Sequence, residues 1–144
     1  MRVDFYQLSR DPVEKVVPML ARKVCESGER LLIVSHEHAQ LEAIAEGLWA
    51  ESEAFLANGF AEEPHAARQP ILLSDSCSAA NEAKMVLMAD GAWREEARRF
   101  DRVFLMFGDA TIEAARELWR ELGEAEDIER NFWKQEAGRW IKAA

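Results

Sequence analysis

Gly28–Trp49, with the sequence GERLLIVSHEHAQLEAIAEGLW, is the stretch that decides the fold class of this chain. Residues 31–34 form an unbroken apolar run, which is typical of a strand buried on both faces. Ser35 follows at the expected N-cap of a helix. Four apolar residues of that helix share one face: Leu41, Ile44, Ala45 and Leu48. The stretch therefore predicts a strand followed by a helix, with the connecting loop at the sheet edge where open α/β folds place ligands.

Segments on both sides of this unit continue the alternation of strands and helices. Further strands are predicted at residues 3–8, 71–73, 84–89 and 102–107. Further helices are predicted after Asp11, at 93–100 and at 110–122. Two β-like segments near the C-terminus, NFWKQ and RWIK, flank a turn at 136–138 and indicate a hairpin. We therefore expect residues 1–144 to form one α/β domain with a three-layer, Rossmann-like fold, a mostly parallel central sheet and a C-terminal β-hairpin.

Several local features are also predicted. Asp11 is the expected N-cap of the first helix and Pro12 its first residue, whereas Pro18 is expected to kink that helix or to lie near its true start. Asp109 is the expected cap of the last helix. Residues 51–68 show no sustained period and are predicted to be a long surface connection, a kind of loop that often carries function.

Composition limits the possible partners and compartments. The 144 residues include 27 acidic and 18 basic side chains, which gives a formal net charge of −9. Such a chain is repelled by a phosphate backbone, so any contact with DNA is expected to be indirect. No apolar run approaches the roughly 20 residues of a membrane span, and the N-terminus lacks the apolar core of a signal peptide, so a cytoplasmic protein is expected. Cys25 and Cys77 are expected to be buried free thiols.

The sequence contains no recognisable catalytic or cofactor-binding motif. The loops after the first two strands read SRDP and SHEH, and neither is a glycine-rich phosphate loop. His36 and His38 form an H-x-H pair, but a metal site needs a third ligand from elsewhere. Ser74, Asp75 and Cys77 lack the surroundings of a nucleophile and its base. We therefore predict no catalytic residue, no metal and no cofactor.

An aromatic cluster at the end of the central helix is the first candidate interaction surface. It comprises Leu48 and Trp49, with Phe55 and Leu56 in the loop that follows. These side chains either close over the core or form anchors for a partner protein, because buried aromatic anchors dominate many interfaces.

The helix around Trp119 is the second candidate. Arg116 and Arg120 are spaced i, i+4 and lie on one side of this helix together with Trp119. Neighbouring glutamates allow the arginines to be ordinary surface ion pairs. Alternatively, the three residues form a basic pocket with an aromatic edge, which suits an acidic peptide with a bulky hydrophobic end or a free carboxylate.

Several segments, taken in their order along the chain, resemble the chi subunit of bacterial DNA polymerase III. They are DFYQL, the 28–49 unit, the Phe55-Leu56 loop, QPILLS, RVFLMF, AARELWREL and FWKQEAGRW. The resemblance implies a Rossmann-like fold without catalysis. It also implies a role as an accessory subunit of the clamp-loader complex, which bridges the psi subunit to the acidic C-terminal tail of single-stranded-DNA-binding protein.

The resemblance also assigns residues to the two surfaces. Trp49 and Phe55, with the adjoining Leu56, match the surface that faces psi, whereas Arg116, Trp119 and Arg120 match the site that receives the tail. The chain reads Phe-Leu-Ala-Asn from residue 55, where the family often has Phe-Leu-Pro-His.

Two other functions remain open at this point. The protein is alternatively an adaptor that presents the same aromatic surface to an accessory DNA-repair helicase. The less favoured alternative is a small nucleotide-binding enzyme that uses the loops near Ser35 and Ser74.

Overall fold

The computed structural model describes residues 1–9, 11–51, 54–136 and 139–144, and these residues form eight strands and three α-helices. The strands are β1 (Arg2–Gln7), β2 (Leu31–Val34), β3 (Asn58–Phe60), β4 (Ile71–Ser74), β5 (Met85–Met88), β6 (Arg102–Phe107), β7 (Glu129–Glu136) and β8 (Arg139–Lys142). The α-helices are α1 (Val13–Glu26), α2 (His38–Trp49) and α3 (Ile112–Gly123). Short 3-10 helices lie at η1 (Ala66–Arg68), η2 (Glu95–Arg99) and η3 (Asp109–Thr111).

All of these strands belong to one sheet, in the order β3-β4-β2-β5-β6-β1-β7-β8. Neighbouring strands are parallel, except for the antiparallel β7–β8 hairpin. The predicted α/β class, the mostly parallel sheet and the terminal hairpin are therefore confirmed. The hairpin joins the main sheet because β7 pairs with β1. Residues 137–138 of the predicted turn lie outside the described residues.

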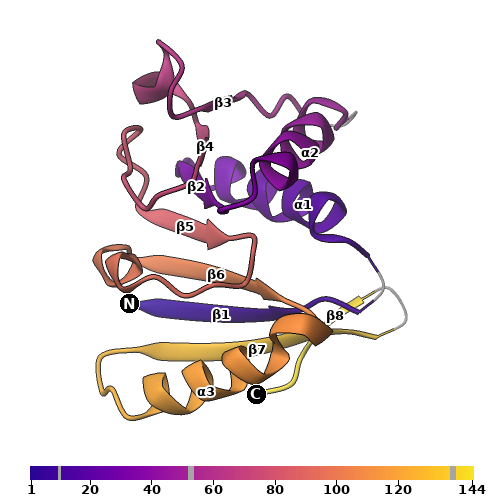
Figure 1. Ribbon diagram of the computed structural model, residues 1–144, viewed down its shortest axis with the longest axis vertical. Coiled ribbons are helices and arrows are strands. Elements are labelled where there is room, and N and C mark those ends of the chain that lie inside the picture. Colours follow the sequence, from indigo (N-terminus) through magenta and orange to yellow (C-terminus); the bar gives the residue numbers. More distant parts are fainter. Residues whose placement is uncertain (10, 52–53, 137–138) are drawn as a thin grey trace.

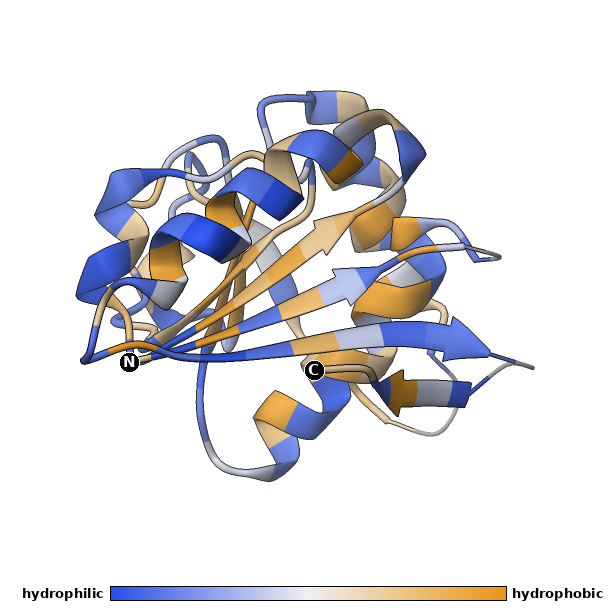
Figure 2. Cartoon of the chain, turned by 90° about the horizontal axis from the view of Figure 1, so that it is seen from below, coloured by the Kyte–Doolittle hydropathy of each residue, from blue (hydrophilic) through white to orange (hydrophobic). Residues whose placement is uncertain are grey.

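Helices cover both faces of the sheet and give it three layers. Leu31 and Ile33 belong to the apolar cluster that includes α1 and α2, whereas Leu32 and Val34 belong to the cluster that includes α3. All four side chains are fully buried, so the predicted strand with two buried faces is confirmed. Figure 1 shows α1 and α2 grouped at one end of the sheet, and α3 beside β1 and β7 at the other end. In Figure 2 the apolar strand segments run between the helical layers.

A proline and a glycine shape the contact between α1 and α2. Pro18 lies inside α1, which begins at Val13 and not at Pro18. Because proline has no amide hydrogen, the Glu14 carbonyl four residues earlier has no helical donor at this position. A Cβ atom on Gly47 of α2 would lie only 2.7 Å from that carbonyl oxygen. The missing side chain at Gly47 therefore allows the two helices to approach each other.

The starts of α1 and α2 differ from the predictions. Pro12, not Asp11, is the N-cap of α1, so the helix begins one residue later than expected. Glu37, not Ser35, is the N-cap of α2. The Ser35 hydroxyl accepts a hydrogen bond from the Glu37 amide at 3.1 Å, and this bond closes a turn that comes before the helix.

The start of α3 differs for a similar reason. Asp109 does not cap an α-helix, because it begins the 3-10 turn η3 and α3 begins only at Ile112. The Gly108 amide donates to the Thr111 hydroxyl at 3.1 Å. The Thr111 hydroxyl thus accepts a hydrogen bond from the Gly108 amide, which has no acceptor within the helix.

Other differences concern short elements. The segment 51–68, predicted as a long surface connection without a sustained period, contains the edge strand β3 and the turn η1. The predicted helix at 93–100 is the 3-10 helix η2. Cys25 and Cys77 are free, as expected, but each is only partly buried, and burial raises the pKa of both thiols.

Candidate functional site

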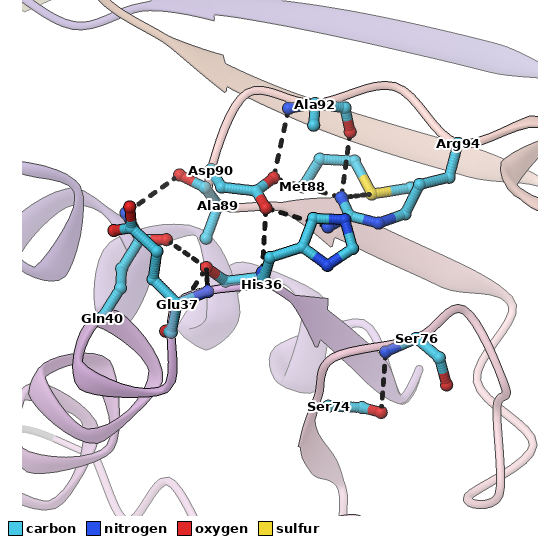
Figure 3. Close-up of polar contacts among 11 residues, drawn as sticks. His36, Glu37, Gln40, Ser74, Ser76, Met88, Ala89, Asp90, Ala92 and Arg94 are labelled. Carbon is cyan, nitrogen blue, oxygen red and sulfur yellow. Dashed lines mark hydrogen bonds and ion pairs between the residues drawn. The ribbon is translucent and has the colours of Figure 1, made fainter.

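A hydrogen bond from the His36 amide to the Asp90 carboxylate joins the loops that follow β2 and β5 at the carboxyl edge of the sheet, and Asp90 is also ion-paired within its own loop (Figure 3). A guanidinium nitrogen of Arg94 lies 2.8 Å from a carboxylate oxygen of Asp90, and both side chains are largely buried. The amides of His36 and Ala92 donate to the same carboxylate at 2.9 and 3.1 Å. Burial opposes ionisation of Asp90, but the bonds from Arg94 and the amides outweigh it, so the pKa of Asp90 lies below its usual value. The amides of His36 and Ala92 at this edge are therefore already bonded to the Asp90 carboxylate of the protein itself.

The polar side chains near this edge make contacts typical of loop and helix ends. Ser35 is fully buried, and the Ser74 hydroxyl accepts a hydrogen bond from the Ser76 amide at 3.2 Å. His38 lies 3.0 Å from Glu42, one helical turn later. A cavity of about 220 Å³ lies beside these residues. Within the part of the chain that the structure describes, no three His, Cys, Asp or Glu side chains are grouped to hold a metal ion.

Trp119 is fixed by aromatic and cationic neighbours on two strands, β1 and β7. Its half-buried ring makes edge-to-face contacts with Phe5 of β1 and Phe132 of β7, with centroids 5.2 and 5.8 Å apart. The Arg130 guanidinium lies 4.2 Å from the ring centroid and also donates to the Trp119 carbonyl. These contacts hold the indole ring in one orientation at the surface of α3.

The three residues predicted to form the basic-aromatic site line one cavity of about 290 Å³. Arg116, Trp119 and Arg120 share it with Phe132 and Ala144. Arg116 also pairs with Glu113 at 3.2 Å, and both side chains are exposed, so the predicted surface ion pairing is present as well. No ion pair involves Arg120 among residues 1–9, 11–51, 54–136 and 139–144, so its charge is available at the rim.

Two neighbours of this site, Phe132 and Arg130, were not predicted. Phe132 is the cross-strand partner of Phe5 in the β1–β7 pairing, which places both rings on the face that α3 covers. The alternation of the NFWKQ segment indicates a strand, but it does not tell which strand lies beside it. The apolar wall of the cavity thus depends on the strand order.

The aromatic cluster after α2, the first predicted surface, separates into exposed and buried parts. Trp49 is 54% exposed and Phe55 is 83% exposed, and their ring centroids lie 5.8 Å apart. Leu56 is only 3% exposed and belongs to the core cluster under α1 and α2. The surface available to a partner therefore consists of Trp49 and Phe55, whereas Leu56 attaches their loop to the core.

Together these observations define a class: an α/β protein whose most distinctive surface features are a basic-aromatic cavity at Trp119 and an exposed aromatic pair, Trp49 and Phe55. The family model of the DNA polymerase III chi subunit, HolC, matches residues 1–129. The chain therefore belongs to the DNA polymerase III chi subunit family. A comparison with curated proteins finds no match. Within its described residues, the protein has no helix that combines the length and the apolar character needed to span a bilayer.

Proposed function

We propose that this protein is a non-catalytic accessory subunit of the DNA polymerase III clamp-loader complex, and that it bridges the psi subunit to the acidic C-terminal tail of single-stranded-DNA-binding protein. Membership of the chi family supports the assignment to the polymerase. The convergence of Arg116, Trp119 and Arg120 on one cavity is the observation that carries the tail site. In this role the protein contacts DNA only indirectly.

The cavity offers the two kinds of contact that an acidic tail with an apolar end requires. The terminal carboxylate of the tail pairs with Arg116 and Arg120, and its last apolar side chain packs beside Trp119, against the cavity wall that includes Phe132. Exposed charge pairs contribute about 0–1 kcal/mol each. Burial of one large apolar side chain contributes roughly 1.5–3 kcal/mol. These contacts together contribute at most about 5 kcal/mol, so the micromolar binding that we expect, about 8 kcal/mol, also needs contacts from the rest of the tail, and it should weaken as salt is added.

The test is a titration of the protein with a labelled acidic peptide ending in Ile-Pro-Phe, followed by fluorescence anisotropy. Arg116→Ala combined with Trp119→Ala should abolish saturable binding, and amidation of the peptide C-terminus should weaken it. Arg98→Ala is a matched control, because Arg98 forms the same kind of exposed i, i+3 pair, with Glu95, as Arg116 forms with Glu113. Unchanged affinity in the folded double variant would refute the site.

The aromatic pair Trp49 and Phe55 is the proposed surface for psi. Their high exposure supports this assignment, because two large aromatic rings in contact form an apolar patch at the surface. Leu56 supports the patch from below. Capture of psi by the wild-type protein and its loss in Trp49→Ala would agree with the proposal. Capture of an accessory helicase through the same residues would favour the adaptor alternative.

A further inference from the structure

A further cavity lies away from both aromatic surfaces. Its volume is about 390 Å³, and it lies on the face of the sheet that carries α1, between that helix and the β7–β8 hairpin. Met19 and Leu20 of α1 form one side, and Trp133 and Trp140 of the hairpin contribute to the other. A volume in this range is typical of small-molecule sites. Both tryptophans lie beyond residue 129, where the family match ends.

The charges that line this cavity all have one sign. Arg2, Lys23 and Arg102 line it, and no aspartate or glutamate does so among the described residues. This is unexpected by composition, because the chain has 27 acidic residues and only 18 basic ones. The cavity is therefore a positive region on an acidic protein, and it favours an anionic ligand.

A buried carboxylate beneath the cavity fixes the two arginines. Asp4 is fully buried and accepts hydrogen bonds from Nε of Arg102 at 2.7 Å and from Nε of Arg2 at 3.2 Å. Since Asp4 engages the Nε atoms, Nη donors of both guanidinium groups remain for a ligand. Planar guanidinium forks held in this way match the geometry of phosphate oxygens. Glu129 also lies 3.7 Å from Arg2, so two carboxylates face the two arginines, and Lys23 supplies the remaining positive charge of the lining.

Aromatic rings form the rest of the lining. Tyr6 stacks on Trp133 with a centroid distance of 6.2 Å and an interplanar angle of 11°, and it meets the edge of Trp140 at 5.1 Å. Both tryptophan rings are only partly buried, so aromatic surface remains for a ligand. Burial, with a smaller contribution from the charge of Asp4, raises the pKa of Tyr6 to about 12, so its hydroxyl keeps its proton at neutral pH. Such rings offer planar stacking surfaces.

We propose that this cavity binds a free nucleoside monophosphate, with the base against Trp133 and Trp140 and the phosphate on Arg2, Lys23 and Arg102. A planar ring that carries a phosphate is the ligand that uses both the aromatic lining and the three cations. An aromatic lining can also bind quaternary ammonium groups, but three cations at the cavity repel them. A nucleotide within a longer strand is disfavoured, because Glu129 lies 3.7 Å from Arg2 and the rest of the chain is strongly acidic.

Isothermal titration of the full chain with adenosine 5′-monophosphate tests this proposal. We expect saturable binding at one site per chain, in the micromolar to low-millimolar range. Lys23→Glu should weaken binding by about tenfold or more, because it reverses one of the three lining charges. Lys15→Glu is the matched control, since it makes the same charge change on the same helix at an exposed residue that does not line the cavity. The affinity of this variant for the nucleotide should stay within about twofold of that of the wild-type protein.

Further ligands test each half of the site. Adenosine and inorganic phosphate should each bind at least about tenfold more weakly than the nucleotide, because each makes only one set of contacts. Trp140→Leu should reduce nucleotide affinity while leaving the weak affinity for phosphate unchanged. Equal binding of phosphate and nucleotide would overturn the proposal, as would tighter binding of an oligothymidylate than of any mononucleotide. Absence of nucleotide binding in folded wild-type protein would also overturn the proposal. None of these three results would affect the proposed peptide site at Trp119.

Discussion

Substitution of Gly47 by alanine tests how closely α1 and α2 must pack. Alanine is the better helix former, and that change alone would stabilise α2 by about 1 kcal/mol. The added Cβ, however, would lie 2.7 Å from the Glu14 carbonyl oxygen and 3.4 Å from Cγ of Pro18. A comfortable carbon–oxygen contact is about 3.3 Å or more, so α1 has to move by roughly 0.6 Å. The nearest atom belongs to the backbone of Glu14, which cannot rotate away from the new Cβ as a flexible side chain could. The cost therefore lies in the upper half of the usual range for overpacking, about 2–3 kcal/mol.

The expected net effect of Gly47→Ala is therefore a destabilisation of about 1–2 kcal/mol. Urea unfolding followed by circular dichroism measures it, and the melting temperature should fall by roughly 2–4 °C for each kcal/mol. Gly108→Ala is the control, because a Cβ there meets nothing within 4 Å and the backbone is extended. That variant should stay within about 0.5 kcal/mol of wild type. A Gly47→Ala protein as stable as wild type, or more stable, would refute the close approach of the two helices.

Three further predictions concern the other sites. Asp90→Asn should cost about 2–3 kcal/mol by breaking a largely buried ion pair. Because the folded-state pKa of Asp90 is depressed, the part of this stabilisation that depends on ionisation is complete above the usual pKa of 3.8 and is lost as the pH falls through the lower folded value. Acid unfolding curves should therefore show the difference between wild type and variant shrinking below pH 3.8. Phe55→Ala should leave the free energy of unfolding within about 0.5 kcal/mol of wild type while abolishing partner capture, whereas Leu56→Ala should cost about 2–4 kcal/mol in urea unfolding; equal costs would contradict the division into exposed and buried parts. Arg130→Leu should free the Trp119 ring and lower affinity for the acidic peptide severalfold by anisotropy, and an unchanged affinity would show that the ring needs no such support.

The elements that could be predicted are those whose signals lie within a few neighbouring residues. The apolar run at 31–34 identified a strand buried on both faces, because a polar residue on either face would be costly in that position. The spacing of Leu41, Ile44, Ala45 and Leu48 identified the buried face of α2. Edge strand β3 was missed, because its three residues are too few to show a period. The helix starts were displaced by one or two residues, because hydrogen bonds in the preceding turns compete with simple caps.

In the candidate sites, too, only contacts between residues close together in the sequence could be predicted. The sequence by itself determined that Arg116, Trp119 and Arg120 lie near one another, because one turn of a helix brings residues three and four apart together. It could not determine that Phe132 completes their cavity, or that Asp4 meets Arg102, 98 residues away, since both contacts depend on which strands are neighbours. Strand order results from the simultaneous burial of every apolar face, so it is a property of the whole chain. Only the tertiary structure therefore decided how the cavities are lined.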